Sequence, residues 1–321
     1  MTQHEITKAA PLLDASGNLT EPGWARSLLP VYCRSQIRAP KTRIKEWDYY
    51  CITDGHIGLA LTIADNGYMG LDSISYLNFD ERFEITKSPM RLFPMGKTHL
   101  PESSRLGASE IAASGYALAF YHEDGARQLS FHMDNFRGKD TIEGILTLTD
   151  EPIESIVIAT PFEPGHFYYN QKINCLRASG WVELGGEKFE LTPDRFFAVL
   201  DWGRGVWTYH NTWYWSSASG ELDGVPFGWN LGYGFGDTSA ATENALFYNG
   251  TLHKLEHINF EIPIKDGTED FLAPWRFTSS DGRFEMQFQP VLDRAACTDL
   301  KLLKSDQHQV FGKFSGTAVL D

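Results

Sequence analysis

Runs of alternating apolar and polar residues, joined by tight-turn pairs, fill most of this 321-residue chain. The runs at 46–54, 56–65 and 67–79 meet at Asp54-Gly55 and Asn66-Gly67. Two-residue hairpin turns prefer such pairs. Further pairs stand at Asn249-Gly250 and Asp281-Gly282. Helical periodicity is hard to find, so the pattern predicts an all-β protein built from antiparallel hairpins.

Strands joined by hairpins, with no β-α-β rhythm, favour closed or nearly closed barrels, because closure removes exposed edge strands. The length favours two units. We predict an irregular N-terminal arm at 1–42, which contains four prolines. Two consecutive lipocalin-like antiparallel β-barrels are expected to follow, at 43–195 and 196–321.

The charge balance limits the classes of partner. With 28 basic and 42 acidic residues the formal charge is −14 and the pI is about 5.1, which repels nucleic-acid phosphates and anionic lipid headgroups. No apolar run approaches the roughly 18–20 residues of a membrane helix, and the first thirty residues do not follow a signal-peptide pattern. We expect a soluble, cytoplasmic protein with no nucleic-acid partner and no integral membrane association. Its oligomeric state is left open.

Neither a metal nor a cofactor is predicted. The four cysteines are scattered with no CxxC pair, which favours reduced, buried thiols. His253, Glu256 and His257 match the H-x-x-E-H spacing of a zinc protease family. Their surroundings alternate with period two, and on a strand two histidines four positions apart are separated by roughly 13 Å. That separation is too great for both to bind one ion.

The densest chemistry lies between 201 and 217. This stretch holds the ionisable side chains Asp201, Arg204 and His210, and the aromatic side chains Trp202, Trp207, Trp213 and Trp215. A carboxyl group in an aromatic pocket has its neutral form favoured and can act as a general acid near neutral pH. Glu243 is a further candidate. The structural alternatives are an Asp201–Arg204 ion pair at a turn between the barrels, and tryptophans that only pack a core.

Two other strands carry candidate binding residues. In the alternating run 167–175, one face holds Asn170, Lys172 and Asn174, which are either solvated or ligand-facing. In the run 226–237, Tyr233 lies on the apolar face, while Asn230 shares the other face with a series of glycines. Repeated glycines mark a coiled strand, or a side chain, backbone or ligand that lies against it.

Several motifs resemble a known family. The segments GWAR, KEWDYY, YYNQKINCL, VLDWGRGVWTYHNTWYW and GWNLGYGFGD look like those of the domain of unknown function family 2804. More distantly, Asp201-Trp202-Gly203 followed by Trp213 and Trp215 resembles the D-x-x-W-G and W-x-W pattern of the carotenoid 1,2-hydratase and AttH-like superfamily. That resemblance implies a double lipocalin-like fold and hydratase or cyclase chemistry on apolar substrates.

Together these features predict a cofactor-independent enzyme that hydrates, isomerises or cyclises a lipid-, isoprenoid- or polyketide-like molecule by proton transfer. Asp201 would be the acid, His210 or Glu243 its partner, and Arg204 an electrostatic clamp. The tryptophans, Asn230, Tyr233, Asn170 and Lys172 would bind the substrate. One alternative is a lipocalin-like carrier of a hydrophobic ligand without chemistry. Another is a structural protein whose pocket is filled by its own side chains.

Overall fold

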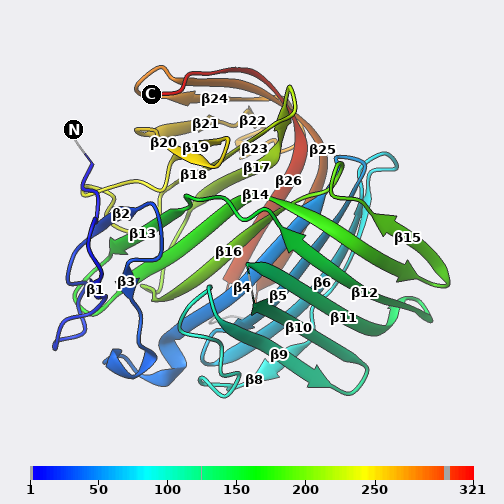
Figure 1. Ribbon diagram of the computed structural model, residues 1–321, viewed down its shortest axis with the longest axis horizontal. Helices are drawn as coiled ribbons and strands as arrows, with labels where there is room; N and C mark the ends of the chain where they lie inside the picture. The colour runs from blue at the N-terminus through cyan, green and yellow to red at the C-terminus, as the bar shows by residue number, and fades with distance from the viewer. Residues whose placement is uncertain (1–2, 124, 300–303) are drawn as a thin grey trace.

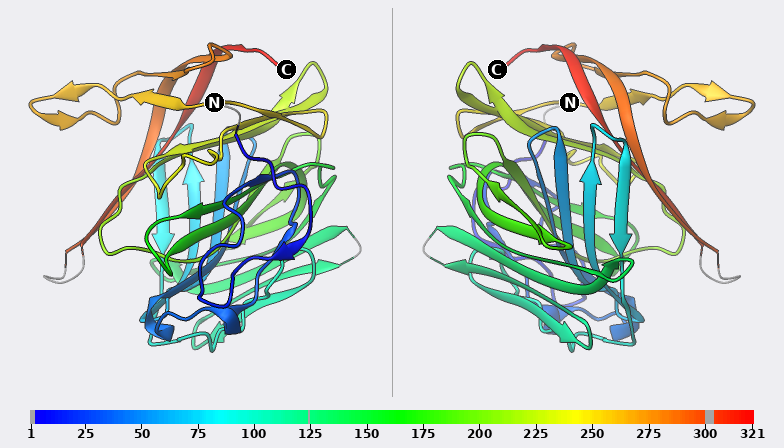
Figure 2. Two further views of the ribbon diagram at one scale, coloured as in Figure 1. Left: turned by 90° about the vertical axis from the view of Figure 1, so that its left-hand side faces the viewer. Right: turned by 90° about the vertical axis from the view of Figure 1, so that its right-hand side faces the viewer.

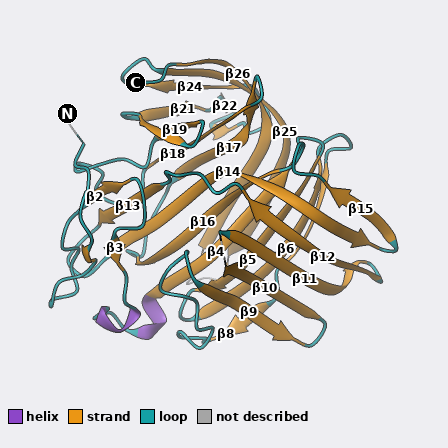
Figure 3. Ribbon diagram, viewed as in Figure 1, coloured by secondary structure: helices purple, strands orange, loops and turns teal. Residues whose placement is uncertain are grey.

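The computed structural model describes residues 3–123, 125–299 and 304–321, so the first two residues of the predicted arm lie outside it. Within these ranges the chain forms 26 β-strands and no α-helix, which confirms the all-β prediction. Two 3-10 turns, η1 (Arg34–Gln36) and η2 (Lys41–Arg43), are the helical segments shown in Figure 3. No helix in the described ranges is long and apolar enough to span a membrane.

One large antiparallel sheet dominates the molecule (Figure 1). Its strands, in spatial order, are β7 (Phe83–Lys87), β6 (Met69–Asn78), β5 (Ile57–Asp65), β4 (Ile44–Thr53), β16 (Phe197–Val206), β14 (Phe167–Leu184), β12 (Asp140–Thr149), β11 (Ala126–Arg137), β10 (Tyr116–Glu123) and β9 (Gly107–Ala113). Four further strands branch from it: β13 (Ile156–Pro161), β2 (Gly23–Ala25), β15 (Glu187–Leu191) and β8 (Met90–Leu92).

The end strands β7 and β9 do not pair with each other in the described chain, so this sheet is not closed. Two closed lipocalin-like barrels are therefore not confirmed. The strand Phe197–Val206, which the sequence places at the start of a second barrel, pairs with β14 on one side and β4 on the other. It is a central strand of the large sheet, and all of its residues are buried.

Two four-stranded sheets follow. One contains β17 (Tyr214–Leu222), β18 (Val225–Tyr233), β19 (Ala245–Tyr248) and β20 (Thr251–Lys254). The other contains β21 (Ile258–Glu261), β24 (Trp275–Ser279), β25 (Phe284–Asp299) and β26 (Lys304–Ala318). Two small ribbons remain: β1 (Ala10–Pro11) with β3 (Pro30–Val31), and β22 (Ile264–Lys265) with β23 (Thr268–Glu269).

The hairpin turns predicted from residue pairs are confirmed. Asp54-Gly55 joins β4 to β5, and Asn249-Gly250 joins β19 to β20. Asn249 (φ 50°) and Gly250 (φ 77°) both have positive φ, as the mirror-image type I turn of a hairpin requires.

Three apolar clusters and the β25–β26 ribbon hold the sheets together; the smallest cluster includes Trp24, Tyr168 and Phe247. Of the other two, the larger core fills the inside of the large sheet, and the smaller core packs aromatic side chains such as Trp229 and Phe277 between the two smaller sheets. The β25–β26 ribbon extends beside the large sheet (Figure 2), where Gln309 donates to the Tyr49 hydroxyl at 2.8 Å. Phe311 of the ribbon contacts Phe79 at a centroid distance of 5.3 Å.

A polar layer separates the large sheet from the β17–β18 hairpin. Asn174 of β14 donates to the backbone carbonyls of Ala218 and Trp229, each at 3.0 Å. Just beyond it, the β14 register shifts between Ile173 and Leu176, and Cys175 adopts φ 62°. Cys175 therefore leaves the alternation predicted for 167–175 and lies against Gly228 of β18.

Candidate functional site

The candidate site lies where β14 and β16 pair beneath the β17–β18 hairpin. In the register of these strands Lys172 is opposite Asp201, and Asn170 is opposite Gly203. Successive side chains of a strand alternate between its faces, so Asn170, Lys172 and Asn174 share the face toward the hairpin. All three are buried. They are therefore not solvated, and they do not point into the large core.

Asp201 is a buried carboxylate with three donors. Lys172 Nζ lies 2.6 Å from its Oδ2, while Asn170 Nδ2 donates to Oδ1 at 2.6 Å and Trp47 Nε1 at 3.1 Å. Burying a charge is costly unless it is paired and hydrogen-bonded, and this arrangement meets both conditions. The Asp201–Lys172 ion pair therefore forms the charged centre of the site.

Glycine at position 203 makes this arrangement fit. Trp47 and Gly203 are cross-strand partners of β4 and β16, and a Cβ at 203 would overlap the Trp47 ring. The indole lies across the glycine and reaches Asp201 with its N–H. The small residue is thus required by the close approach of an aromatic side chain.

Glu243 is the second carboxyl group of the site and lies in the segment between β18 and β19. Asn230 of β18 donates to its Oε2 at 3.0 Å and to its backbone carbonyl at 2.9 Å. Trp215 Nε1 donates to the side-chain Oδ1 of Asn230 at 2.7 Å. Burial raises the pKa of Glu243, while the Lys172 ammonium and the Asn230 hydrogen bond oppose that shift. The glycine series of β18 has a structural cause here, because a Cβ at Gly232 would overlap the Glu243 carboxylate.

Aromatic rings extend from the two carboxyl groups toward the surface. Trp207 lies 5.4 Å from Trp47 and 4.9 Å from Phe235 between ring centroids, and Tyr168 lies 4.9 Å from Phe235. Trp213, at 6.0 Å from Trp207, is 42% exposed. We call Trp47, Tyr168, Trp207, Trp213 and Phe235 the aromatic cluster. The cluster therefore reaches from the buried carboxyl groups to the surface at Trp213.

Three further predicted residues, Trp215, Asn230 and Trp207, contact the carboxyl groups' neighbours. The Lys172 ammonium lies 4.7 Å from the centroid of the Trp215 ring, within the range of a cation–π contact. Asn230 links Trp215 to Glu243, and Trp207 belongs to the aromatic cluster. The structure thus brings eight predicted residues together: Asp201, Glu243, Asn170, Lys172, Trp207, Trp213, Trp215 and Asn230.

Arg204 and Trp202 lie on the opposite face of β16. Arg204 is fully buried inside the large sheet, where its guanidinium pairs with Asp48 at 3.1 Å. Trp202 packs edge-on against Tyr169 in the same core. The alternative of an Asp201–Arg204 ion pair is wrong, because residues three apart on a strand face opposite ways. Arg204 is accordingly not placed to act on Asp201 as a clamp.

His210 and Tyr233 also lie apart from the two carboxyl groups. His210 is exposed on the segment between β16 and β17, with its ring 4.8 Å from that of Tyr209. Tyr233 stacks on Tyr214 at 4.8 Å and contacts Phe260 in the smaller core. Glu243, in contrast, lies close enough to Asp201 for the two carboxyl groups to interact electrostatically.

Sequence reasoning missed Trp47, Tyr168 and Phe235. Burial raises the pKa of Tyr168, and the nearby carboxylates of Glu243 and Asp201 add to that shift, so its phenol is part of the same electrostatic environment. Trp47 and Tyr168 lie within KEWDYY and YYNQKINCL. The sequence indicated strands and polar binding candidates in these segments, but no role for their aromatic side chains at the site.

The described residues contain no group of three or more His, Cys, Asp or Glu side chains able to hold a metal ion. His253 lies in β20, and His257 follows that strand. The four cysteines are free thiols, but only Cys175 is buried. Cys33 and Cys51 are half-buried and Cys297 is exposed, so the prediction of buried thiols is wrong for these three.

Comparison with known proteins places the fold and the family. No curated protein sequence is significantly similar to the chain. A solved structure from Nitrosomonas europaea, provisionally described as AttH, is 14% identical, covers 96% of both chains and has a TM-score of 0.57. Kievitone hydratase from Nectria haematococca is 11% identical, with 95% of this chain and 96% of that chain covered and a TM-score of 0.47. The model of a domain of unknown function, DUF2804, matches residues 3–321, and the chain therefore belongs to the DUF2804 family.

Proposed function

We propose that this protein is a cofactor-independent enzyme that hydrates, isomerises or cyclises an apolar small molecule by proton transfer. One observation carries the proposal: two carboxyl groups of different character share one aromatic-lined site. Asp201 pairs with an ammonium at 2.6 Å, whereas burial raises the pKa of Glu243. Titratable groups whose environments differ in this way are typical of an acid and base pair.

The proposal divides the roles of the two carboxyl groups differently from the sequence prediction. A carboxylate that accepts from Lys172, Asn170 and Trp47 is suited to be a base or a counter-charge. Glu243, whose neutral form burial favours, is the better acid. Asp201 therefore becomes the base in this proposal, and Glu243 the proton donor.

The proposed reaction begins when Glu243 protonates an alkene or enol carbon of the substrate. The π electrons form the new C–H bond, and the positive charge left on the neighbouring carbon lies against the faces of Trp47 and Trp207. Aromatic faces attract cations, and the Asp201 carboxylate adds electrostatic stabilisation. In hydration a water oxygen bonds to that carbon and its proton passes to Asp201. In isomerisation or cyclisation Asp201 removes a carbon-bound proton.

The shared fold with the AttH structure and the superfamily resemblance of the 201–215 motif support this reaction class. Fold likeness alone does not define a function, so the proposal rests on the site. We further propose that the substrate is isoprenoid-, lipid- or polyketide-like and that the protein is cytoplasmic. We also propose that the chain consists of two lipocalin-like units whose sheets are open.

The test uses solvent deuterium as a substrate-independent signal. Purified protein is incubated in D₂O with a panel of unsaturated isoprenoids, fatty acids and polyketide-like enols, and deuterium gain is read by mass spectrometry. We expect wild-type protein to label at least one compound, and a loss of about 100-fold or more in Glu243→Gln and Asp201→Asn, the usual range for a general acid or base. His210→Asn is the matched control and should retain the activity.

Retained labelling in a folded Glu243→Gln variant would exclude Glu243 as the proton donor. Binding of a panel member without any label in wild-type protein would favour the carrier alternative.

A further inference from the structure

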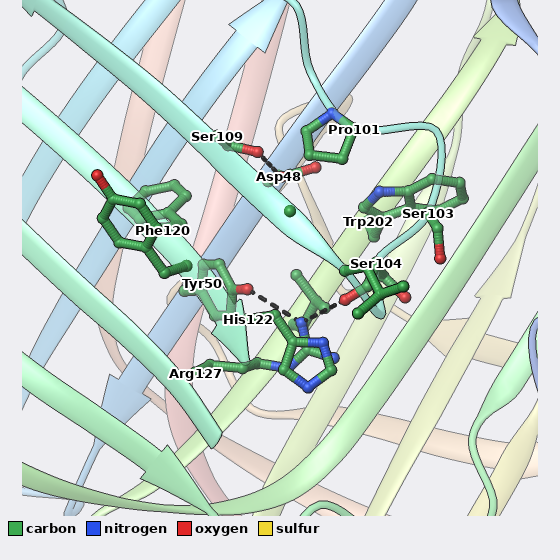
Figure 4. Close-up of a pocket in the computed structure, with 14 residues that line it drawn as sticks. Asp48, Tyr50, Pro101, Ser103, Ser104, Ser109, Phe120, His122, Arg127 and Trp202 are labelled. Carbon is green, nitrogen blue, oxygen red and sulfur yellow. Dashed lines mark hydrogen bonds between the residues drawn. The ribbon is translucent and has the colours of Figure 1, made fainter. Parts of the chain in front are cut away.

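A small cavity lies inside the large sheet, near the face of β16 that is opposite to Asp201 (Figure 4). Its volume is about 20 Å³, which accommodates about one water-sized group. Strands β4, β10, β11 and β16 and the segment 101–109 supply its walls. Its polar lining includes Asp48, Ser104, Ser109, His122, Arg127 and Trp202.

Two polar side chains of this wall, Trp202 and His122, have no hydrogen-bond partner within the described chain. Trp202 is only 1% exposed, and within the described chain its indole Nε1 makes no hydrogen bond. An indole N–H is a donor only, and leaving a buried donor unpaired costs about 1–3 kcal/mol. The cavity therefore suits a group that accepts a hydrogen bond from Trp202.

The charges around the cavity are already paired, so they do not call for an ion. Arg127 pairs with Glu151 at 2.9 Å and donates to the Ser104 carbonyl at 2.8 Å. The Asp48 carboxylate pairs with Arg204 at 3.1 Å and accepts from the Ser109 hydroxyl. An anionic ligand would meet the Asp48 carboxylate at close range, and like charges there are unfavourable.

A neutral hydroxyl group can hydrogen-bond to both the Trp202 donor and the Asp48 acceptor. Its oxygen accepts from Trp202, and its proton is donated to Asp48, whose carboxylate has about four acceptor sites and uses two of them here. Two apolar residues at the rim are solvent-exposed, Leu106 at 74% and Tyr121 at 41%. An alkyl chain attached to the hydroxyl would leave the cavity across these side chains.

We propose that this cavity is a second ligand site that takes the hydroxyl head of an aliphatic alcohol. It is formed by residues of the opposite face of β16, so it does not depend on the function proposed for Asp201 and Glu243. Its test can therefore succeed or fail independently of that function.

The test follows the Trp202 indole directly. Protein labelled with ¹⁵N-tryptophan is titrated with 1-hexanol, and the Trp202 indole resonance is assigned from its absence in Trp202→Phe. We expect this resonance to shift saturably with 1-hexanol and less with 1-methoxypentane, which accepts but cannot donate. Hexanoate should leave it unchanged. A Trp202 resonance that does not move with 1-hexanol, or that moves equally with all three compounds, would overturn the proposal.

A pair of variants separates binding from folding. Trp202→Phe keeps a ring but removes the donor, and loss of one hydrogen bond of about 1.4 kcal/mol weakens binding about tenfold. Trp229→Phe removes an indole that already donates to Ser216 in the smaller core, so the affinity for 1-hexanol should stay unchanged. Affinities are measured by ligand-observed NMR on variants with a wild-type melting temperature. Equal affinities in both folded variants would contradict the site.

Discussion

Replacing Gly203 by Ala tests how the fold positions the Asp201 site. The added Cβ would overlap the Trp47 ring, so the indole must move away from β16 and lose its 3.1 Å hydrogen bond to Asp201. Overpacking of this kind costs about 1–3 kcal/mol, and loss of a hydrogen bond to a charged group costs about 1.5–3 kcal/mol. Allowing up to about 1 kcal/mol for the favourable entropy of Gly→Ala, we expect a net loss of about 1.5–6 kcal/mol.

The assay is urea unfolding, followed by far-UV circular dichroism. Gly220→Ala is the matched control, because this glycine also lies in a strand, has no positive φ and has open space where its Cβ would stand. It should leave the free energy of unfolding within about 1 kcal/mol of wild type. If Gly203→Ala is as stable as Gly220→Ala, Trp47 does not lie on Gly203 and the structural account of the site is wrong.

Three further predictions concern charge and thiols. Lys172→Met leaves the buried Asp201 carboxylate without its cation and should lower the free energy of unfolding by about 3–5 kcal/mol. Lys188→Met, the control, breaks an exposed pair with Glu190 and should lower it by about 1 kcal/mol or less. Equal urea midpoints for the two variants would contradict the buried pair. Folding raises the pKa of Glu243 above its ordinary value of 4.5, so this group favours folding below that pH, and its contribution is lost as pH rises through the folded pKa. Glu243→Gln should therefore gain stability relative to wild type as the pH rises above 4.5. A difference in urea midpoint that does not change with pH would refute the assignment. Burial raises the pKa of Cys175 to about 11, so a thiol reagent at neutral pH should modify exposed Cys297 first and Cys175 only on unfolding, as peptide mass spectrometry would show.

Local chemistry made much of the fold predictable. Hairpin turns at Asp54-Gly55 and Asn249-Gly250 follow from the backbone conformations that these residues tolerate, and period-two alternation correctly placed Asn170 and Lys172 on one face. Alternation failed at Cys175, where the β14 register shifts. Such an irregularity depends on contacts with another strand, here Gly228 of β18, and has no local signal.

The site was predictable in composition but not in its pairing. Strand periodicity alone places Asp201 and Arg204 on opposite faces, and that inference was available from the sequence. Their actual partners come from distant segments: Trp47 lies 154 positions before Asp201, and Asp48 lies 156 positions before Arg204. Only the register of β4 beside β16 brings them together. The motif resemblance to DUF2804 is confirmed, and the AttH structure shares the fold. Neither likeness carried information about these pairs.

A crystal structure with a bound substrate identified by deuterium labelling tests the central claim most directly. The reacting carbon should lie about 3–3.5 Å from the Glu243 carboxyl group, the distance of a near-attack geometry. The rest of the molecule should lie against Trp47 and Trp207, with Asp201 on the far side of that carbon. A substrate bound inside the large sheet beside Trp202, with Glu243 and Asp201 untouched, would contradict the account.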